Sequence, residues 1–181
     1  LKHTYNQAFS VYALSSYYEA SGDREALDLA YRLYDIIEGR MRDGSGYREA
    51  FDEAFNETGN DKLSENGVMA SRTMNTLLHV FEAYTELYRV DRDEKVAETI
   101  KWMMDIIATK VYNPKLHRQE VFFDDRWQPI IDLHSYGHDI ETAWLVDRGL
   151  EVLGDDACVR RMSPITRDLT EQVYRTAFRD A

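Results

Sequence analysis

The sequence predicts an all-α fold in which three helical hairpins stack side by side, as in an α/α toroid or solenoid. Long stretches without helix breakers support this, because the 181 residues include only three prolines and nine glycines, while 44% are hydrophobic. An internal repeat of paired helices is the second observation. A chain of this length can bury one sizeable core, so we expect a single domain over residues 1–181.

Helical periodicity divides the chain into three pairs of helices. Apolar residues recur at spacings of three and four and mark the buried face of each helix. Asp23, Asp93 and Asp155 stand where the second helix of each pair begins, as N-caps do. The expected helices cover residues 5–20, 23–40, 71–89, 93–113 and 135–153, with a last stretch after Asp155 that is kinked or restarted at Ser163-Pro164.

Short inserts follow the first two pairs. Residues 47–52 and 119–124 alternate between polar and apolar side chains, which indicates a short strand or β-hairpin in each insert. Residues 56–66 form a polar and irregular stretch, a loop long enough to raise the question of function.

The three pairs are copies of one unit. Tyr18 in the first copy matches Tyr88 in the second, and Asp23 matches Asp93 at the same offset. Asp93 in turn matches Asp155 in the third copy, at a slightly shorter offset. A single hairpin cannot cover its own apolar face, so the units must stack against one another. In a ring built in this way, the more aromatic and polar helix of each pair should line the inside.

Composition argues against several classes of partner. The net charge of −11 is spread along the chain, and such a surface repels phosphate backbones and anionic lipids. No apolar run reaches transmembrane length, and no signal peptide is visible. The single cysteine, Cys158, excludes an internal disulfide and a multi-cysteine metal site and fits the cytoplasm. The chain begins at Leu1 within a helical pattern, so we expect it to be part of a longer protein.

The helix expected over residues 135–153 carries the strongest candidate site. Helical geometry places His138, Glu141 and Trp144 on one broad face. An imidazole can take and return a proton near neutral pH. A carboxylate can orient that ring or bind a sugar hydroxyl, and an indole offers a flat apolar surface to a pyranose. The structural alternative is a hydrogen-bonded histidine, a solvated glutamate and a tryptophan that fills the core.

A second polar pair, Asn75 and His79, stands one turn apart in the middle unit. The repeat superposes two sets of three residues, which are Phe9, His79 and Glu141, and Asn6, Thr76 and His138. We therefore expect these side chains at equivalent inward-facing depths on three successive inner helices, as in a pocket. His3, His117 and His134 are weaker candidates.

Metal and nucleophile chemistry fit the sequence less well. The pairs His79-x-x-Glu82 and His138-x-x-Glu141 reverse the Glu-x-x-His order of dinuclear metal bundles, and the further glutamates of such bundles are not evident. No Gly-x-Ser-x-Gly turn is present. Cys158 follows Asp155, and acidic neighbours raise the pKa of a thiol, so we interpret this cysteine as structural. The sequence therefore predicts neither a metal nor a cofactor.

Four ordered blocks carry a family resemblance. They are residues 2–9, residues 62–69, residues 74–76 with His79, and residues 135–141 with Trp144. Together they resemble the N-acylglucosamine 2-epimerase superfamily, and within it the cellobiose 2-epimerases, over nearly the whole chain. The resemblance implies an (α/α)6 barrel, of which this chain is a central fragment. It also implies cofactor-free epimerisation at C2 of the reducing-end glucose unit in a β-1,4-linked disaccharide such as cellobiose.

The resemblance also implies roles for single residues. His138 matches one of two histidines, of which one removes the C2 proton and the other delivers a proton to the opposite face. Glu141 and Trp144 match residues that contact this histidine or the sugar, and Asn75 and His79 match substrate-contacting positions. Three hairpins are half of a six-hairpin barrel, and the partner histidine has no counterpart here. We therefore expect the isolated chain to be inactive.

Two other functions stay open. One is a non-catalytic half-toroid that binds carbohydrate or a partner, whose open edges would expose apolar helix faces and favour self-association. The other is an epimerase or isomerase that acts on N-acylglucosamine or mannose. The expected partner is a small saccharide, with no nucleic acid and no membrane, and the expected location is the cytoplasm.

Overall fold

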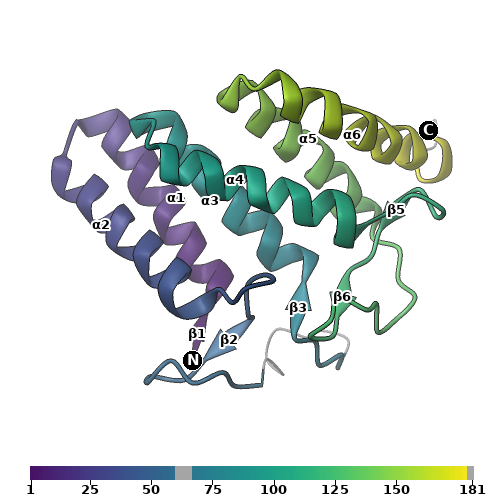
Figure 1. Cartoon of the computed structure of the whole chain (residues 1–181), viewed down its shortest axis with the longest axis horizontal. Helices are drawn as coiled ribbons and strands as arrows, with labels where there is room; N and C mark the ends of the chain where they lie inside the picture. Colours follow the sequence, from purple (N-terminus) through teal and green to yellow (C-terminus); the bar gives the residue numbers. More distant parts are fainter. Residues whose placement is uncertain (60–66, 179–181) are drawn as a thin grey trace.

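The structure, a computed structural model, describes residues 1–59 and 67–178. In these residues six long helices form three hairpins (Figure 1). The helices are α1 (Thr4–Ser21), α2 (Arg24–Ile36), α3 (Met74–Asp91), α4 (Glu94–Ile106), α5 (Tyr136–Leu153) and α6 (Asp156–Thr176). We call α1, α3 and α5, which pack side by side, the inner helices, and α2, α4 and α6, which cover them, the outer helices. The prediction of three helical hairpins is confirmed.

The helix boundaries follow the sequence repeat. The inner helices begin at Thr4, Met74 and Tyr136. The numbers of residues between these starts equal those between Asp23, Asp93 and Asp155. The starts of the outer helices, Arg24, Glu94 and Asp156, have the same separations. In the first two units the outer helix continues as a π-helical turn, over Ile37–Met41 and Ile107–Val111. The second of these turns ends before Asn113-Pro114, slightly earlier than predicted.

Aspartate side chains begin the outer helices, as predicted. The carboxylate of Asp23 accepts the backbone N–H of Glu25 at 3.0 Å, and Asp93 accepts that of Lys95 at 2.9 Å. Asp155 caps α6 in the same way. Each cap satisfies a backbone donor that the first turn of a helix leaves without a partner.

The last helix differs from the prediction. Of the expected kink or restart at Ser163-Pro164, the restart does not occur, because α6 is one helix of 21 residues with Pro164 inside it. Proline cannot donate to the carbonyl of Arg160. Both residues are exposed, so water can satisfy this carbonyl. Ser163 lies within this helix, and its backbone carbonyl accepts the hydroxyl hydrogen of Thr166 at 3.2 Å.

The inserts form three short antiparallel strand pairs in the described residues. β1 (Lys2–His3) pairs with β2 (Ala50–Phe51), β3 (Arg72–Thr73) with β6 (Phe122–Phe123), and β4 (Tyr112–Asn113) with β5 (Arg118–Gln119). Of these three pairs, only β4 and β5 are joined directly by a short turn. In the other two pairs an insert strand joins the residues that directly precede α1 or α3. Residues 60–66 of the predicted loop, and with them most of the 62–69 block, lie outside the described residues.

A buried glutamate in the first insert anchors α3. The carboxylate of Glu49, which is 4% exposed, accepts the backbone N–H of Thr73 and the hydroxyl of Thr76, both at 2.6 Å. The backbone carbonyl of the same residue accepts the N–H of Thr4 at 3.1 Å. Glu49 therefore fixes the first turns of α1 and α3 relative to each other.

Gln119 in the second insert, which pairs with Tyr112 as Tyr47 pairs with Arg42 in the first insert, anchors α5. Its side-chain amide donates to the backbone carbonyl of His138 at 3.1 Å and to the carboxylate of Asp139 at 3.2 Å. The backbone N–H of Gln119 donates to the same Asp139 oxygen at 3.0 Å. The ring of His134 bonds to the other oxygen at 2.8 Å. Asp139 is 1% exposed, so this cluster is buried at the start of α5.

Two inner helices, α3 and α5, approach each other closely at Gly149. Phe81 on α3 is fully buried, and its ring lies against the backbone of Gly149 on α5. A Cβ atom at Gly149 would stand 2.4 Å from Cζ of Phe81, which is too close for any contact between carbon atoms. A glycine here therefore sets the separation of the two helices.

We predict that Gly149→Ala destabilises the chain by about 1–3 kcal/mol, because the buried Phe81 ring cannot move aside without strain. Gly137→Ala in the same helix is the matched control, since no heavy atom lies within 4 Å of its added Cβ. Urea unfolding monitored by circular dichroism measures both free energies of unfolding. Equal stability of Gly149→Ala and the unaltered chain would contradict the packing described here.

A second prediction concerns pH. Complete burial raises the pKa of the Glu49 carboxyl from 4.5 to about 7, although the hydrogen bonds from Thr76 and Thr73 and the charge of Arg72 act in the opposite direction. Because the folded state holds this proton more tightly than the unfolded chain, the stability it contributes is fully present below about pH 4.5. It is lost as the pH rises through about 7.

Glu49→Gln removes the titrating group and keeps a donor and an acceptor at its end. Relative to this variant, the unaltered chain should lose about 3 kcal/mol between mildly acidic and mildly alkaline pH, since each pKa unit corresponds to about 1.4 kcal/mol. Urea unfolding over a pH series measures the difference. The exposed Glu53→Gln variant serves as control. A difference between Glu49→Gln and the unaltered chain that stays constant with pH would refute this prediction.

Candidate functional site

The inner helices turn polar and aromatic side chains toward one another. Residues from all three line a cavity of about 20 Å³, which holds about one water molecule. The lining residues are Tyr12 on α1, Glu82, Thr85 and Glu86 on α3, and Trp144, Leu145 and Arg148 on α5. The facing sides of the inner helices therefore meet at this cavity.

Helical spacing extends these facing sides toward the N-terminal ends of the helices. On α3, steps of three and four residues lead from Glu82 back to His79 and Asn75. On α5, steps of three residues lead from Trp144 back to Glu141 and His138. The five predicted site residues thus lie on the two helix faces that converge at the cavity. We call this surface the inner face.

His138 is the third residue of α5 and is half-buried. Its Nδ1 lies 2.8 Å from the hydroxyl oxygen of Ser135, and its backbone carbonyl accepts the hydrogen bond from Gln119. Among the described residues, the ring bonds to Ser135 and not to Glu141, and Nε2 has no protein partner. The nitrogen that is left for chemistry is therefore Nε2.

His79 has a carboxylate partner. Its Nδ1 lies 3.0 Å from Oε2 of Glu82, and the two side chains are 13% and 20% exposed. The ring also contacts Phe9 on α1, with 4.7 Å between ring centroids. The pairing that we expected between His79 and Asn75 is not the one observed, because the ring nitrogen bonds to Glu82. The expected proximity of the repeat-related residues Phe9 and His79 is observed.

Three predicted side chains remain available to a ligand. Asn75 and Glu141 are half-buried, and Trp144 is 56% exposed. Within the described part of the chain, neither Asn75 nor Glu141 uses its side chain in a hydrogen bond with protein. An exposed indole and unpaired amide and carboxylate groups can bind the two kinds of surface that a sugar presents, its C–H faces and its hydroxyls.

The prediction of an inward-facing Thr76 is wrong. Its side chain is buried at 1% exposure and donates its hydroxyl hydrogen to Glu49. The repeat brings Asn6, Thr76 and His138 to the third position of each inner helix, but the short threonine hydroxyl turns toward the insert, where a carboxylate is within reach. Asn6 is exposed. The threefold equivalence therefore holds for the backbone and not for the side chains.

The histidines that ranked lower have structural surroundings. His134 bonds to the buried Asp139, and its ring centroid lies 4.1 Å from that of Tyr136. His117 is exposed, in the turn between β4 and β5, and pairs with Asp168 at 2.9 Å. Neither belongs to the inner face.

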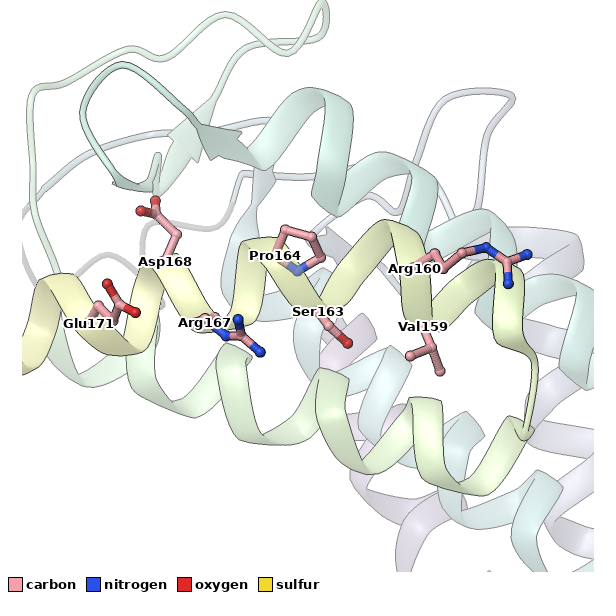
Figure 2. A pocket seen from close by; sticks show the side chains of 7 residues that line it. All are labelled: Val159, Arg160, Ser163, Pro164, Arg167, Asp168 and Glu171. Carbon is pink, nitrogen blue, oxygen red and sulfur yellow. The ribbon is translucent and has the colours of Figure 1, made fainter.

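Another hollow of about 420 Å³ lies on the outer helix α6 (Figure 2). All the residues that line it come from that one helix, namely Val159, Arg160, Ser163, Pro164, Arg167, Asp168 and Glu171. It contains no predicted site residue. Figure 2 shows its charged side chains at separate places along α6, with Asp168 directed toward the turn between β4 and β5, where it pairs with His117.

Two further observations concern metal ligands and the thiol. In residues 1–59 and 67–178, no three histidine, cysteine or acidic side chains come together as metal ligands would. Burial, together with Asp155, raises the pKa of the Cys158 thiol, as the sequence predicted. No helix in the described ranges is both long and apolar enough to cross a membrane.

The sequence did not predict the contacts of Ser135, Glu82 and Gln119. Ser135 and Glu82 each stand three residues from a histidine, a spacing that brings side chains together on a helix, so this signal was present. Gln119 is far from His138 in sequence, and no sequence pattern marked it as an anchor.

Comparison with known proteins agrees with this architecture. The model of the family N-acylglucosamine 2-epimerase (GlcNAc 2-epimerase) matches residues 1–180. A cellobiose 2-epimerase of Ruminococcus albus is 48% identical over 180 residues, which are 99% of this chain and 46% of that protein. The chain thus spans about half the length of the curated relatives that it matches.

Solved structures show the same fold. The crystal structure of a sugar epimerase from a ruminal bacterium has a TM-score of 0.96 at 48% identity and covers 99% of this chain and 46% of that one. The structure of cellobiose 2-epimerase from Bacillus thermoamylovorans B4167 has a TM-score of 0.91 at 44% identity and covers 97% and 45%. The three hairpins are therefore part of an (α/α)6 barrel. The chain belongs to the N-acylglucosamine 2-epimerase family.

Proposed function

We propose that this chain supplies one proton-transfer histidine, His138, and part of the sugar-binding surface of a sugar 2-epimerase. The observation that carries the proposal is the half-buried His138 ring at the start of α5, with Nδ1 occupied by Ser135 and Nε2 unoccupied. The relatives named cellobiose 2-epimerases support the same reaction class.

The proposed reaction begins from the open-chain form of the sugar. The C2 hydrogen is acidic there because the C1 carbonyl can delocalise the electrons that the proton leaves behind. Nε2 of His138 takes this proton as a general base, and the sugar becomes an enediolate. Return of a proton to the opposite face of C2 inverts that centre and restores the carbonyl. No bond other than C2–H is exchanged overall, so the reaction needs no redox cofactor.

The remaining residues of the inner face bind the sugar in this proposal. Glu141, one turn after His138, accepts a sugar hydroxyl, and the exposed indole of Trp144 packs against a pyranose ring. Asn75 and His79 bind hydroxyls from the side of α3. The group that delivers the second proton must lie on the other side of C2. We propose that it lies in the part of the complete protein beyond the half that this chain spans.

Cellobiose is the proposed substrate, with the mannose-ended epimer as product. It is favoured over N-acylglucosamine and mannose because the relatives that match at 42% to 48% identity are named cellobiose 2-epimerases. A non-catalytic carbohydrate-binding module would use the same Trp144 and Glu141 contacts, but it would not need a histidine with an unoccupied Nε2.

Hydrogen exchange at C2 tests the proposal. The complete gene product, incubated with cellobiose in heavy water, should introduce deuterium at C2 of the reducing-end unit, which proton NMR detects. His138→Ala should slow this exchange at least about 100-fold, the lower range for loss of a general base. The 181-residue chain alone should show no exchange, because it lacks the second proton-transfer group.

Two controls make this result specific. His117→Ala removes an exposed histidine that lies away from the inner face and should exchange at the unaltered rate. Parallel incubations with N-acylglucosamine and mannose identify the substrate, since the preferred sugar exchanges fastest. Full exchange by the His138→Ala protein would refute the role of His138, and exchange of neither cellobiose nor the other two sugars would refute the epimerase proposal.

A further inference from the structure

Two equivalent positions at the start of each inner helix are occupied by different residues in the three units. The residue before the helix and the third residue within it are His3 and Asn6, Thr73 and Thr76, and Ser135 and His138. In α3 the pair makes an ordinary cap, because the hydroxyl oxygen of Thr73 accepts the backbone N–H of Thr76 at 3.0 Å.

Ser135 stands at the same place but does not cap α5. Its hydroxyl oxygen lies instead 2.8 Å from Nδ1 of His138. Serine is among the best N-cap residues, so a serine at this position that does not cap its helix has another partner. The first turn of α5 is held by Gln119, through the backbone carbonyl of His138 and the side chain of Asp139. The Ser135 hydroxyl is therefore free to hold the ring.

We propose that Ser135 is a positioning residue for His138, whose hydroxyl oxygen accepts the Nδ1–H and leaves the lone pair of the neutral ring on Nε2. This inference rests on the proposed function only where it makes Nε2 the general base. A neutral imidazole carries one N–H, so the partner of one nitrogen decides which nitrogen can act as a base. Gln119 fixes the backbone of His138, and Ser135 fixes its ring.

A hydroxyl suits both halves of a proton exchange. When Nε2 has taken a proton, the ring still carries Nδ1–H, so the same hydrogen bond to Ser135 persists without rearrangement. His79 offers the contrast on the neighbouring helix, because its Nδ1 faces the carboxylate of Glu82. The two histidines of the inner face therefore have different partners at Nδ1: a hydroxyl for His138, which suits reversible proton transfer, and a carboxylate for His79, which suits a fixed hydrogen bond.

Nitrogen NMR of the 181-residue chain, labelled with ¹⁵N at histidine, tests the inference without any activity. In mildly alkaline buffer, the His138 signals, assigned by their loss in His138→Gln, should show a protonated Nδ1 and an unprotonated Nε2. In Ser135→Ala the signals should shift toward the form protonated on Nε2. Ser135→Thr keeps the hydroxyl and should retain the original pattern.

Thr73→Ala is the matched control, because it removes the hydroxyl at the equivalent position of α3. It should lower the midpoint of thermal unfolding through loss of the cap and leave the His138 signals unchanged. If Ser135 were only a structural residue, Ser135→Ala would behave like Thr73→Ala. An unaltered chain with Nε2 protonated, or a Ser135→Ala chain with an unchanged His138 pattern, would overturn the inference.

Kinetics of the complete gene product separate this inference from the proposed function. Ser135→Ala should lower kcat for C2 exchange about 10-fold, with little change in KM, and Ser135→Thr should restore it. If the NMR pattern depends on Ser135 but exchange does not depend on His138, the positioning role stands and the proposed function fails. If exchange depends on His138 but the pattern does not depend on Ser135, the positioning role fails alone.

Discussion

Each insert holds the first turn of the inner helix that follows it, and the geometry of the inner face depends on this contact. Glu49 binds the start of α3, and Gln119 binds the start of α5. Both are buried, where an unpaired polar group would be costly, so each side chain must find its partners on the helix end. Because Asn75, His79 and His138 lie within the first two turns, these anchors set their positions.

Glu49 and Gln119 each hold the first turn of an inner helix, but they do so with different hydrogen-bonding groups. Glu49 meets only donors, the N–H of Thr73 and the hydroxyl of Thr76, so a carboxylate fits. Gln119 meets acceptors, the carbonyl of His138 and the carboxylate of Asp139, so an amide is required. A glutamate at position 119 would bring two carboxylates into contact. Because Gln119 holds the first turn of α5, Ser135 does not cap this helix, and its hydroxyl bonds to the His138 ring instead.

Much of the fold could be predicted from local sequence patterns. Periodicity indicated the six helices, and Asp23, Asp93 and Asp155 marked the starts of three of them, because both effects act within a few residues. The pairing of β1 with β2 and of β3 with β6 could not be predicted, since neither partner carries a mark of the other. The predicted restart at Ser163-Pro164 does not occur, because an exposed proline can remain inside a long helix. The carboxylate of Glu82 and the hydroxyl of Ser135 depend on side-chain orientation, which spacing alone does not decide.

The repeat was more informative about backbone than about chemistry. It correctly placed Phe9 against His79, yet it also grouped Thr76 with His138, although the first side chain bonds to the insert and the second to Ser135. The roles of Asn75, His79, His138, Glu141 and Trp144 remain predictions. They are consistent with a surface on which two helix faces converge, and the proposed reaction class rests on the family relationship.

The most direct measurement is a crystal structure of the complete gene product with reduced cellobiose, an open-chain alcohol that has no carbonyl to make its C2 hydrogen acidic. We predict that C2 of the reduced unit lies about 3–3.5 Å from Nε2 of His138, a distance suited to proton transfer. We also predict that Ser135 remains bonded to Nδ1 and that Trp144 packs on the sugar. A ligand bound away from the inner face, or one that faces Nδ1 of His138, would contradict these predictions.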